Sequence, residues 1–197
     1  MSLSPMLLLA LALSYVAGSL PSGLWMGLWL RGVDIRKEGS KNIGATNTMR
    51  VLGKPLGATA LFFDIVKGLV PVVFFARLSP EDIHLPMACG VAAVLGHTFS
   101  LFIRFKGGKG VATSTGVFLG LATWPALIAI GLFAVVVAIT RMVSAGSILG
   151  ALSLAITVWL FPLPLIVQVM GVLIAALVVI KHRSNLKRIL QGDENRI

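Results

Sequence analysis

A lysine framed by glycines lies between two apolar segments of the chain, in the run Gly107-Gly108-Lys109-Gly110. Glycines let backbone N–H groups approach an anion closely, the lysine supplies a mobile positive charge, and the N-terminus of a following helix adds a partial positive charge. Phosphate is the natural ligand for such a set. Similar runs occur in ordinary turns, and the spacing does not match the nucleotide-binding pattern G-x-x-x-x-G-K-[ST], so other residues must decide whether this is a phosphate site.

A second polar segment, residues 31–55, is rich in small hydrogen-bonding side chains. Hydroxyl, amide and guanidinium donors are the groups needed to hold a small polyol phosphate, and an arginine can engage two phosphate oxygens at once. The candidates are Ser40, Asn42, Thr46, Asn47 and Arg50. The alternative is a solvated loop whose cations only set the orientation of the chain in a membrane.

Two histidines lie beside polar segments at the ends of apolar runs. His97 precedes the glycine-lysine run, and His182 lies with Asn185 just after the last apolar run. Either imidazole could accept a proton or hold a substrate oxygen, although a histidine at a helix end often serves only as a cap.

Two other pairs of opposite charge are interpreted as structural. Asp34 and Arg36 are two residues apart, so we expect them to point in different directions and Asp34 to pair with a nearby cation at the membrane surface. Asp64 and Lys67 lie at i and i+3 near the start of the second apolar segment, which suits an intramembrane ion pair.

The composition is that of an all-α integral membrane protein. Hydrophobic residues make up 57% of the 197 residues and charged residues only 12%, with a mean hydropathy of +0.95. The formal net charge of +10 points to anionic lipids or anionic substrates rather than to nucleic acid, because the chain is so apolar. Three histidines, one cysteine and no tight carboxylate cluster argue against a metal site, and no cofactor is predicted.

We predict seven transmembrane helices, several of them short, with an uncleaved first helix. Apolar segments occupy 4–30, 56–77, 86–103, 111–123, 126–140, 147–161 and 165–180. Seven spans, with a break near Trp124-Pro125, place nearly all of the cations on one side, which by the positive-inside rule is the cytoplasm. The N-terminus is then outside and the C-terminus cytoplasmic. Segments 31–55, 96–113 and 181–197 are expected to share the cytoplasmic face and to form one site.

Together these segments resemble the bacterial acyl-phosphate-dependent glycerol-3-phosphate acyltransferases, the PlsY family. The resemblance covers nearly the whole chain. Three stretches carry it: residues 34–50, residues 96–113 and residues 182–185. In the second stretch, the matching residues are Gly96-His97 at its start and Gly107 to Thr113 at its end. Lys41 departs from the family pattern, which commonly has a small residue between Ser40 and Asn42.

The resemblance implies a single membrane-embedded acyltransferase domain, residues 1–197. It implies an enzyme that transfers a fatty acyl group from acyl phosphate to the 1-hydroxyl of glycerol 3-phosphate. The products are lysophosphatidic acid and inorganic phosphate, in the first step of phospholipid synthesis. The implied setting is the bacterial cytoplasmic (inner) membrane, with the active site on the cytoplasmic side, the lipid bilayer as a partner and an upstream acyl-phosphate-forming enzyme as a candidate partner.

The predicted site residues follow from these motifs. Catalytic roles are predicted for Lys109, His182, Asn185 and Ser40. Substrate-binding roles are predicted for Asn42, Thr46, Asn47, Arg50, His97, Gly107, Gly108 and Gly110. The proton acceptor is left open between His182 and a phosphate oxygen of the substrate.

Two alternatives come from other classes of protein. A small anion transporter should have polar residues spread through the depth of the membrane, whereas here they gather in a few segments. A phosphotransferase acting on lipid alcohols usually needs clustered aspartates for a divalent ion, and the sequence has no such cluster.

Overall fold

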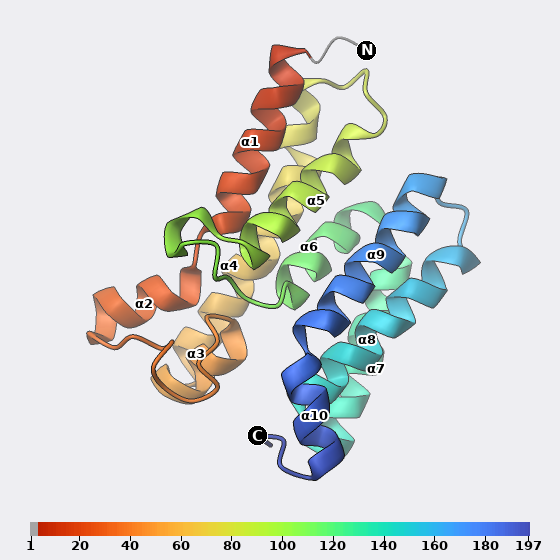
Figure 1. Cartoon of the computed structure of the whole chain (residues 1–197). Helices are drawn as coiled ribbons and strands as arrows, with labels where there is room; N and C mark the ends of the chain where they lie inside the picture. The colour runs from red at the N-terminus through yellow and green to blue at the C-terminus, as the bar shows by residue number, and fades with distance from the viewer. Residues whose placement is uncertain (1–3) are drawn as a thin grey trace. The chain divides into compact units, whose positions relative to one another are not determined.

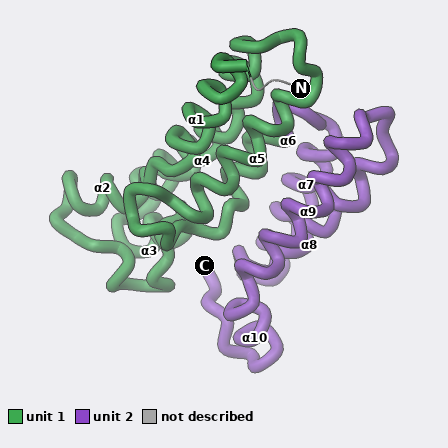
Figure 2. Tube along the Cα trace, turned by 45° about the horizontal axis from the view of Figure 1, so that its top comes forward, with its two compact units in different colours: residues 1–117 green, residues 118–197 purple. Residues whose placement is uncertain are grey.

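The structure, a computed structural model, describes residues 4–197. The regular elements of these residues are all helices (Figure 1), as the composition predicts. The chain divides into two compact units, residues 1–117 and 118–197 (Figure 2).

In the first unit α4 packs against both α1 and α5, which also pack on each other, and against the short helices α2 and α3. Two single-turn helices, η1 and η2, follow α4 and α5. The elements are α1 (Pro5–Ser19), α2 (Ser22–Arg31), α3 (Ala45–Leu52), α4 (Lys54–Val73), η1 (Phe75–Leu78), α5 (Leu85–Thr98), η2 (Leu101–Ile103) and the start of α6 (Val111–Leu121).

Helices α1 and α5 approach each other so closely that their backbones touch. A Cβ atom on Gly18 would lie 2.1 Å from the carbonyl oxygen of Ala93, and one on Gly96 would lie 2.3 Å from that of Tyr15. Contact through small residues is typical of helices that pack in a membrane, where dispersion forces and not the hydrophobic effect hold them together.

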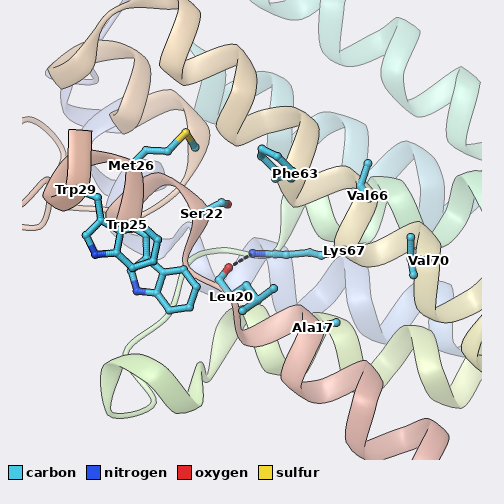
Figure 3. A pocket seen from close by; sticks show the side chains of 10 residues that line it. All are labelled: Ala17, Leu20, Ser22, Trp25, Met26, Trp29, Phe63, Val66, Lys67 and Val70. Carbon is cyan, nitrogen blue, oxygen red and sulfur yellow. Dashed lines mark hydrogen bonds between the residues drawn. The ribbon is translucent and has the colours of Figure 1, made fainter. Parts of the chain in front are cut away.

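The first apolar segment is not one helix, as we had expected, but two. Helices α1 and α2 meet at an angle of 48° around Leu20 and Pro21, because a proline has no N–H to continue the helical ladder. The carbonyl oxygen of Leu20 at this break accepts a hydrogen bond of 2.7 Å from Nζ of Lys67 (Figure 3). The break is therefore stabilised by a side chain from α4.

Lys67 also forms the ion pair that the sequence predicts. Its Nζ lies 2.7 Å from Oδ1 of Asp64, and Oγ of Ser22 donates to the same carboxylate oxygen at 2.6 Å. Both charged residues are buried, at 2% and 7% exposure. The pair lies in the middle of α4 rather than near its start, and it joins α4 to the first residue of α2.

The second unit contains helices α7 to α10. Helix α8 packs on both α7 and α9. Arg141 lies between the predicted apolar segments 126–140 and 147–161, and it forms the left-handed turn between α7 and α8, with φ 62°. Helices α9 and α10 are bent by 57° at His182. The elements are α7 (Thr123–Thr140), α8 (Val143–Thr157), η3 (Val158–Leu160), α9 (Leu165–Lys181) and α10 (Arg183–Gln191).

Among residues 4–197, four helical segments are long and apolar enough to cross a membrane, or up to six if each bent pair counts as one span. The four are Lys54–Leu78, Leu85–Ile103, Thr123–Thr140 and Val143–Leu160. At about 1.5 Å per residue, the 11 residues of α6 are too short for a hydrocarbon layer of about 30 Å. The expected break near Trp124-Pro125 is confirmed, since α6 ends at Leu121 and α7 begins at Thr123. The count of seven spans and the orientation of the termini stay predictions.

Candidate active site

The loop between α2 and α3 is organised by the side chain of Asn47, which is 1% exposed. Its Nδ2 donates to the carbonyl oxygens of Ile35 and Asn42, both at 2.8 Å, and of Glu38 at 3.2 Å. Its Oδ1 accepts a hydrogen bond of 2.7 Å from the N–H of Ser40. One amide thus holds four points of the loop together. In the structure Asn47 orders the loop, and its role in binding substrate stays a prediction.

Other side chains predicted to bind substrate lie nearer the surface of this loop and of α3 than Asn47 does. Ser40 and Thr46 are partly buried and Arg50 is exposed. Thr46 and Arg50 are four residues apart and share one face of α3. The Oδ1 atom of Asn42 accepts from the N–H of Gly44 at 2.8 Å, which fixes the turn that leads into α3. The structure therefore places these predicted donors on one ordered loop and helix.

Our expectation that Asp34 and Arg36 point apart is wrong. The segment is a turn and neither a helix nor a strand, so the two side chains meet. Nε and Nη2 of Arg36 lie 2.9 and 2.7 Å from the two carboxylate oxygens of Asp34. These side-chain hydrogen bonds from Arg36 lower the pKa of Asp34 to about 2.

The glycine-lysine loop folds back onto the end of α5. The N–H groups of Gly107 and Gly108 donate to the carbonyl oxygens of Thr98 and His97, at 3.2 and 3.0 Å. A Cβ atom on Gly108 would lie 2.2 Å from Nε2 of His97, whose side chain is buried. The loop can approach the imidazole this closely only because position 108 has no side chain. Gly110 has φ +83°, a conformation that favours glycine, and α6 begins at the next residue.

Three buried hydroxyl groups lie in the segments that meet at this loop. The Oγ1 atoms of Thr98 and Thr113 and the Oγ atom of Ser114 have no hydrogen-bond partner among residues 4–197, and the three residues are 0%, 0% and 6% exposed. A Cβ atom on Gly110 would lie 3.4 Å from the hydroxyl of Thr98 and 3.9 Å from that of Ser114. Buried polar groups nearly always have partners, so such a cluster calls for a ligand.

The groups around Lys109 are of the kinds that bind anions in proteins. Lys109 is partly buried and lies two residues before the first turn of α6, whose leading N–H groups have no partner within the helix. These N–H groups, the lysine and the unpaired hydroxyls together supply the donors and the positive potential that a phosphate needs. We had not predicted roles for Thr98 and Ser114. Their closeness to the loop arises from its fold-back, which no spacing in the sequence reveals.

In the second unit, His182 lies between α9 and α10 and is 3% exposed. Its Nδ1 lies 2.8 Å from the carbonyl oxygen of Val178. Because a carbonyl oxygen can only accept, Nδ1 carries a proton, and in the neutral ring Nε2 is then the atom that can accept one.

Asn185, one turn into α10, is held by a carboxylate that we did not predict to have a role. Nδ2 of Asn185 donates to Oε1 of Glu194 at 2.6 Å. Glu194 is 7% exposed and also accepts from Ser144 and Arg188, both at 2.8 Å. Burial alone would raise the pKa of Glu194, but the hydrogen bonds from these three residues outweigh it and hold the pKa below its ordinary value.

The tail after α10 is tied down at a second point. The N–H of Ile197 donates to the carbonyl oxygen of Arg141 at 2.9 Å, and Nε of Arg141 donates to the carbonyl oxygen of Ile197 at 2.9 Å. Glu194 therefore lies on a segment anchored at both ends to the second unit. Within residues 4–197 no group of three or more His, Cys, Asp or Glu side chains is placed to hold a metal ion.

Comparison with known proteins identifies the class and then the family. The family model of glycerol-3-phosphate acyltransferases matches residues 8–192. A glycerol-3-phosphate acyltransferase of Geobacter sulfurreducens is 44% identical over 189 residues, and the match covers 96% of each chain. One of Fusobacterium nucleatum is 42% identical over 186 residues, and that match covers 94% of this chain and 95% of the other. A crystal structure of PlsY, an integral membrane glycerol 3-phosphate acyltransferase, in its glycerol 3-phosphate form, has a TM-score of 0.91 and 36% identity, and covers 97% of this chain and 95% of that one.

The apolar helices and these relatives define a multi-pass membrane protein of the acyltransferase class. The chain belongs to the glycerol-3-phosphate acyltransferase family, that of PlsY. The family resemblance drawn from the sequence is confirmed.

Proposed function

We propose that this protein transfers a fatty acyl group from acyl phosphate to the 1-hydroxyl of glycerol 3-phosphate, giving lysophosphatidic acid and inorganic phosphate. Membership of the family supports glycerol 3-phosphate as the acceptor. Related PlsY crystal structures represent a glycerol 3-phosphate form and a lysophosphatidic acid form, which supports the same acceptor and product. The acyl-phosphate donor is our own inference from the anion site and the sequence motifs.

The observation that carries the proposal is the pair of unpaired, buried hydroxyls of Thr98 and Ser114 beside Gly110 of the glycine-lysine loop. A soluble thioester donor would bring no phosphate to the reacting carbonyl, whereas an acyl phosphate does. We assign its phosphate to the loop of Gly107, Gly108, Lys109 and Gly110. The N–H groups of Gly107 and Gly108 hold the loop on Thr98 and His97, so Lys109 and the leading N–H groups of α6 are the proposed donors. Positive charge there stabilises the phosphate as it leaves.

The acceptor is assigned to the ordered loop and to α3. Ser40, Asn42, Thr46 and Arg50 would orient glycerol 3-phosphate, with the arginine on its phosphate. Asn47 supports this set by shaping the loop, and His97 supports the donor loop by packing against Gly108. His182 and Asn185 are proposed to act in the same reaction, Asn185 being oriented by Glu194.

In the chemical step, the 1-hydroxyl oxygen attacks the carbonyl carbon of the acyl phosphate, a C–O ester bond forms, and the bond from that carbon to the phosphate oxygen breaks. An acyl phosphate is already an activated mixed anhydride, so positioning and charge stabilisation suffice and no acyl-enzyme is needed. We assign the hydroxyl proton to a phosphate oxygen of the substrate rather than to Nε2 of His182.

A membrane setting suits both ends of this reaction. Burying the donor chain contributes about 0.8 kcal/mol per methylene relative to water, so the bilayer holds the donor while the polar loops hold the acceptor. We propose that residues 1–197 act as one acyltransferase domain in the bacterial cytoplasmic membrane. In this proposal the domain has seven spans and an outside N-terminus, with the loops on the cytoplasmic side, where an acyl-phosphate-forming enzyme would deliver the donor.

The substitution Thr98→Val tests the anion site, because valine has nearly the same shape as threonine. Removal of an unpaired buried hydroxyl should leave the melting temperature unchanged or raised. The KM for acyl phosphate should nevertheless rise severalfold if the hydroxyl serves the donor phosphate. Thr59→Val, at an exposed position of α4, is the control. An unchanged KM in a stable Thr98→Val protein would refute the assignment.

A further inference from the structure

A second basic site lies in the first unit, apart from the glycine-lysine loop. Three cations surround a pocket of about 450 Å³, which we call the basic pocket; it is lined by Arg36, Phe102, Ile103, Arg104 and Lys106. Its cations come from two loops that are far apart in sequence, one after α2 and one after η2. None of them has a role in the reaction proposed above.

The backbone of the second loop is held in a conformation that presents these cations. Arg104 and Phe105 have φ 53° and 60°, values that side chains other than glycine rarely adopt. Two hydrogen bonds hold the turn. The N–H of Phe105 donates to the carbonyl oxygen of Ser100 at 2.8 Å, and the N–H of Lys106 donates to the carbonyl oxygen of Ile103 at 3.1 Å. Strained residues of this kind gather at ligand sites, where the surrounding structure fixes them.

Arg36 has donors left for a ligand although it pairs with Asp34. The carboxylate engages only one N–H on Nε and one on Nη2. Three of the five N–H groups of the guanidinium therefore remain. With Asp34 counted, the cluster of Arg36, Arg104 and Lys106 still has an excess of positive charge.

The basic pocket lies beside the ends of two candidate membrane-spanning segments. Arg104 directly follows the candidate span Leu85–Ile103, and Arg36 closely follows the bent pair that ends at Arg31. Exposed apolar side chains, including Phe102 and Phe105 at 44% and 58% exposure, lie among the cations. Aromatic residues beside cations at the end of a span are typical of the membrane interface.

An apolar path leads from the basic pocket along the helices. The ring of Phe102 packs edge-on against that of Trp25, with centroids 5.3 Å apart, and Trp25 stacks on Trp29 at 5.0 Å. Both tryptophans line an apolar pocket of about 440 Å³ between α1, α2 and α4 (Figure 3). Met26 and Phe63 line it as well. This volume lies within the range of small-molecule sites.

We infer that the two pockets together bind an anionic phospholipid of the bilayer. Its phosphate lies on Arg36, Arg104 and Lys106, and one acyl chain passes over Phe102 and along Trp25 and Trp29 into the apolar pocket. A free phosphate would use only the cations, whereas a phospholipid uses both the cations and the aromatic path. The site does not depend on the acyl donor or acceptor of the proposed reaction.

The two tryptophans allow a direct test with phospholipids that carry bromine in the acyl chain, which quench nearby indoles. In a Trp124→Phe, Trp159→Phe protein, only Trp25 and Trp29 report. Brominated phosphatidylglycerol, diluted into phosphatidylcholine vesicles, should quench them more strongly than brominated phosphatidylcholine at the same dilution. Equal quenching by the two lipids would overturn the inference.

Charge-matched variants separate this site from general surface charge. Arg104→Gln with Lys106→Gln should lower the relative affinity for phosphatidylglycerol about tenfold, since each basic side chain near an anionic surface contributes severalfold. Lys37→Gln with Lys54→Gln removes the same charge from exposed positions outside both pockets and should retain the preference. Equal loss in the two double variants would refute a specific site.

Two further measurements complete the test. Addition of inorganic phosphate should leave the quenching unchanged, and displacement of the brominated lipid by phosphate would overturn the assignment to a lipid. Circular dichroism and size-exclusion chromatography of each variant in detergent should match the parent protein. If Arg104→Gln with Lys106→Gln does not fold, Phe102→Ala, which leaves every charge in place, should by itself weaken quenching by phosphatidylglycerol, and unchanged quenching would contradict the inference.

Discussion

Nδ2 of Asn185 lies 2.6 Å from Oε1 of Glu194, and the same carboxylate also accepts hydrogen bonds from Ser144 and Arg188. One buried acid thus joins α8, α10 and the C-terminal tail. It also fixes the amide that we place in the reaction. Loss of the Glu194 carboxylate should therefore both lower the stability of the second unit and displace the side chain of Asn185.

The substitution Glu194→Gln should destabilise the protein. The N–H₂ group of a glutamine cannot accept hydrogen bonds, so part of the donor set around position 194 would lose its acceptor. The loss of charge-assisted hydrogen bonds in a buried cluster lowers the free energy of unfolding by about 2–4 kcal/mol. Thermal unfolding in detergent should show a lower Tm, and activity at a permissive temperature should fall because Asn185 loses its support. Asp193→Asn changes an exposed neighbour and should affect neither quantity. A Glu194→Gln protein as stable and active as the parent would disprove this role.

The same acid predicts a pH dependence of stability. The folded-state pKa of Glu194 is depressed, so its stabilising contribution is fully present above the unfolded-state pKa of about 4.3 and is lost as the pH falls through the folded-state value. The Tm of the parent protein should decrease on acidification below about pH 4.3 by more than that of Glu194→Gln. Parallel curves for the two proteins would show that Glu194 does not carry this dependence. Asp34, with a pKa of about 2, pairs with an exposed arginine and should contribute little.

The substitution Gly108→Ala should disable the donor loop. Its Cβ would lie 2.2 Å from Nε2 of a buried His97, so the loop or the imidazole must move, and a displacement of about 1 Å costs roughly 100-fold in rate. Steady-state kinetics with acyl phosphate should show this loss in kcat/KM. Gly131→Ala is the matched control, because a Cβ there would meet nothing within 4 Å. If both variants kept parental activity, the close packing of the loop on His97 would have no functional role.

Replacement of His182 separates the two proton acceptors. If a substrate phosphate oxygen takes the proton, His182→Ala should keep most of its kcat while the KM for glycerol 3-phosphate rises. His182→Gln, which keeps a donor for the carbonyl oxygen of Val178, controls for the lost hydrogen bond of 2.8 Å. Complete loss of kcat in both variants, with substrate binding intact, would instead identify His182 as the base.

The sequence predicted the helices well because their hydrophobicity is strong. The break between α6 and α7 and the loop at Arg141 were also predicted, since Pro, Gly and a cation interrupt apolar runs there. The bend at Pro21 was missed, because a proline inside an apolar run can either kink a helix or begin a new one. The sequence also does not reveal that Lys67 of α4 donates to the carbonyl oxygen of Leu20 at this break.

The site was predictable in its residue types but not in its supporting contacts. The glycines and lysine of 107–110 are adjacent in sequence, so their chemistry can be read directly. The substrate-binding role of Asn47 stays a prediction, but the hydrogen bonds of its amide with Ile35, Glu38, Ser40 and Asn42 could not be predicted. Contacts of this kind depend on the path of a loop. The same holds for the position of the Thr98 and Ser114 hydroxyls near Gly110 and for the hydrogen bond between Asn185 and Glu194.

One assay of the purified protein in detergent can identify both the acyl donor and the acyl acceptor. Glycerol 3-phosphate is supplied with either acyl phosphate or acyl-CoA of the same chain length, and lysophosphatidic acid and inorganic phosphate are both quantified. We expect equal amounts of the two products from acyl phosphate and no lysophosphatidic acid from acyl-CoA. Efficient acylation from acyl-CoA, or none from acyl phosphate by a folded protein, would contradict the proposed function.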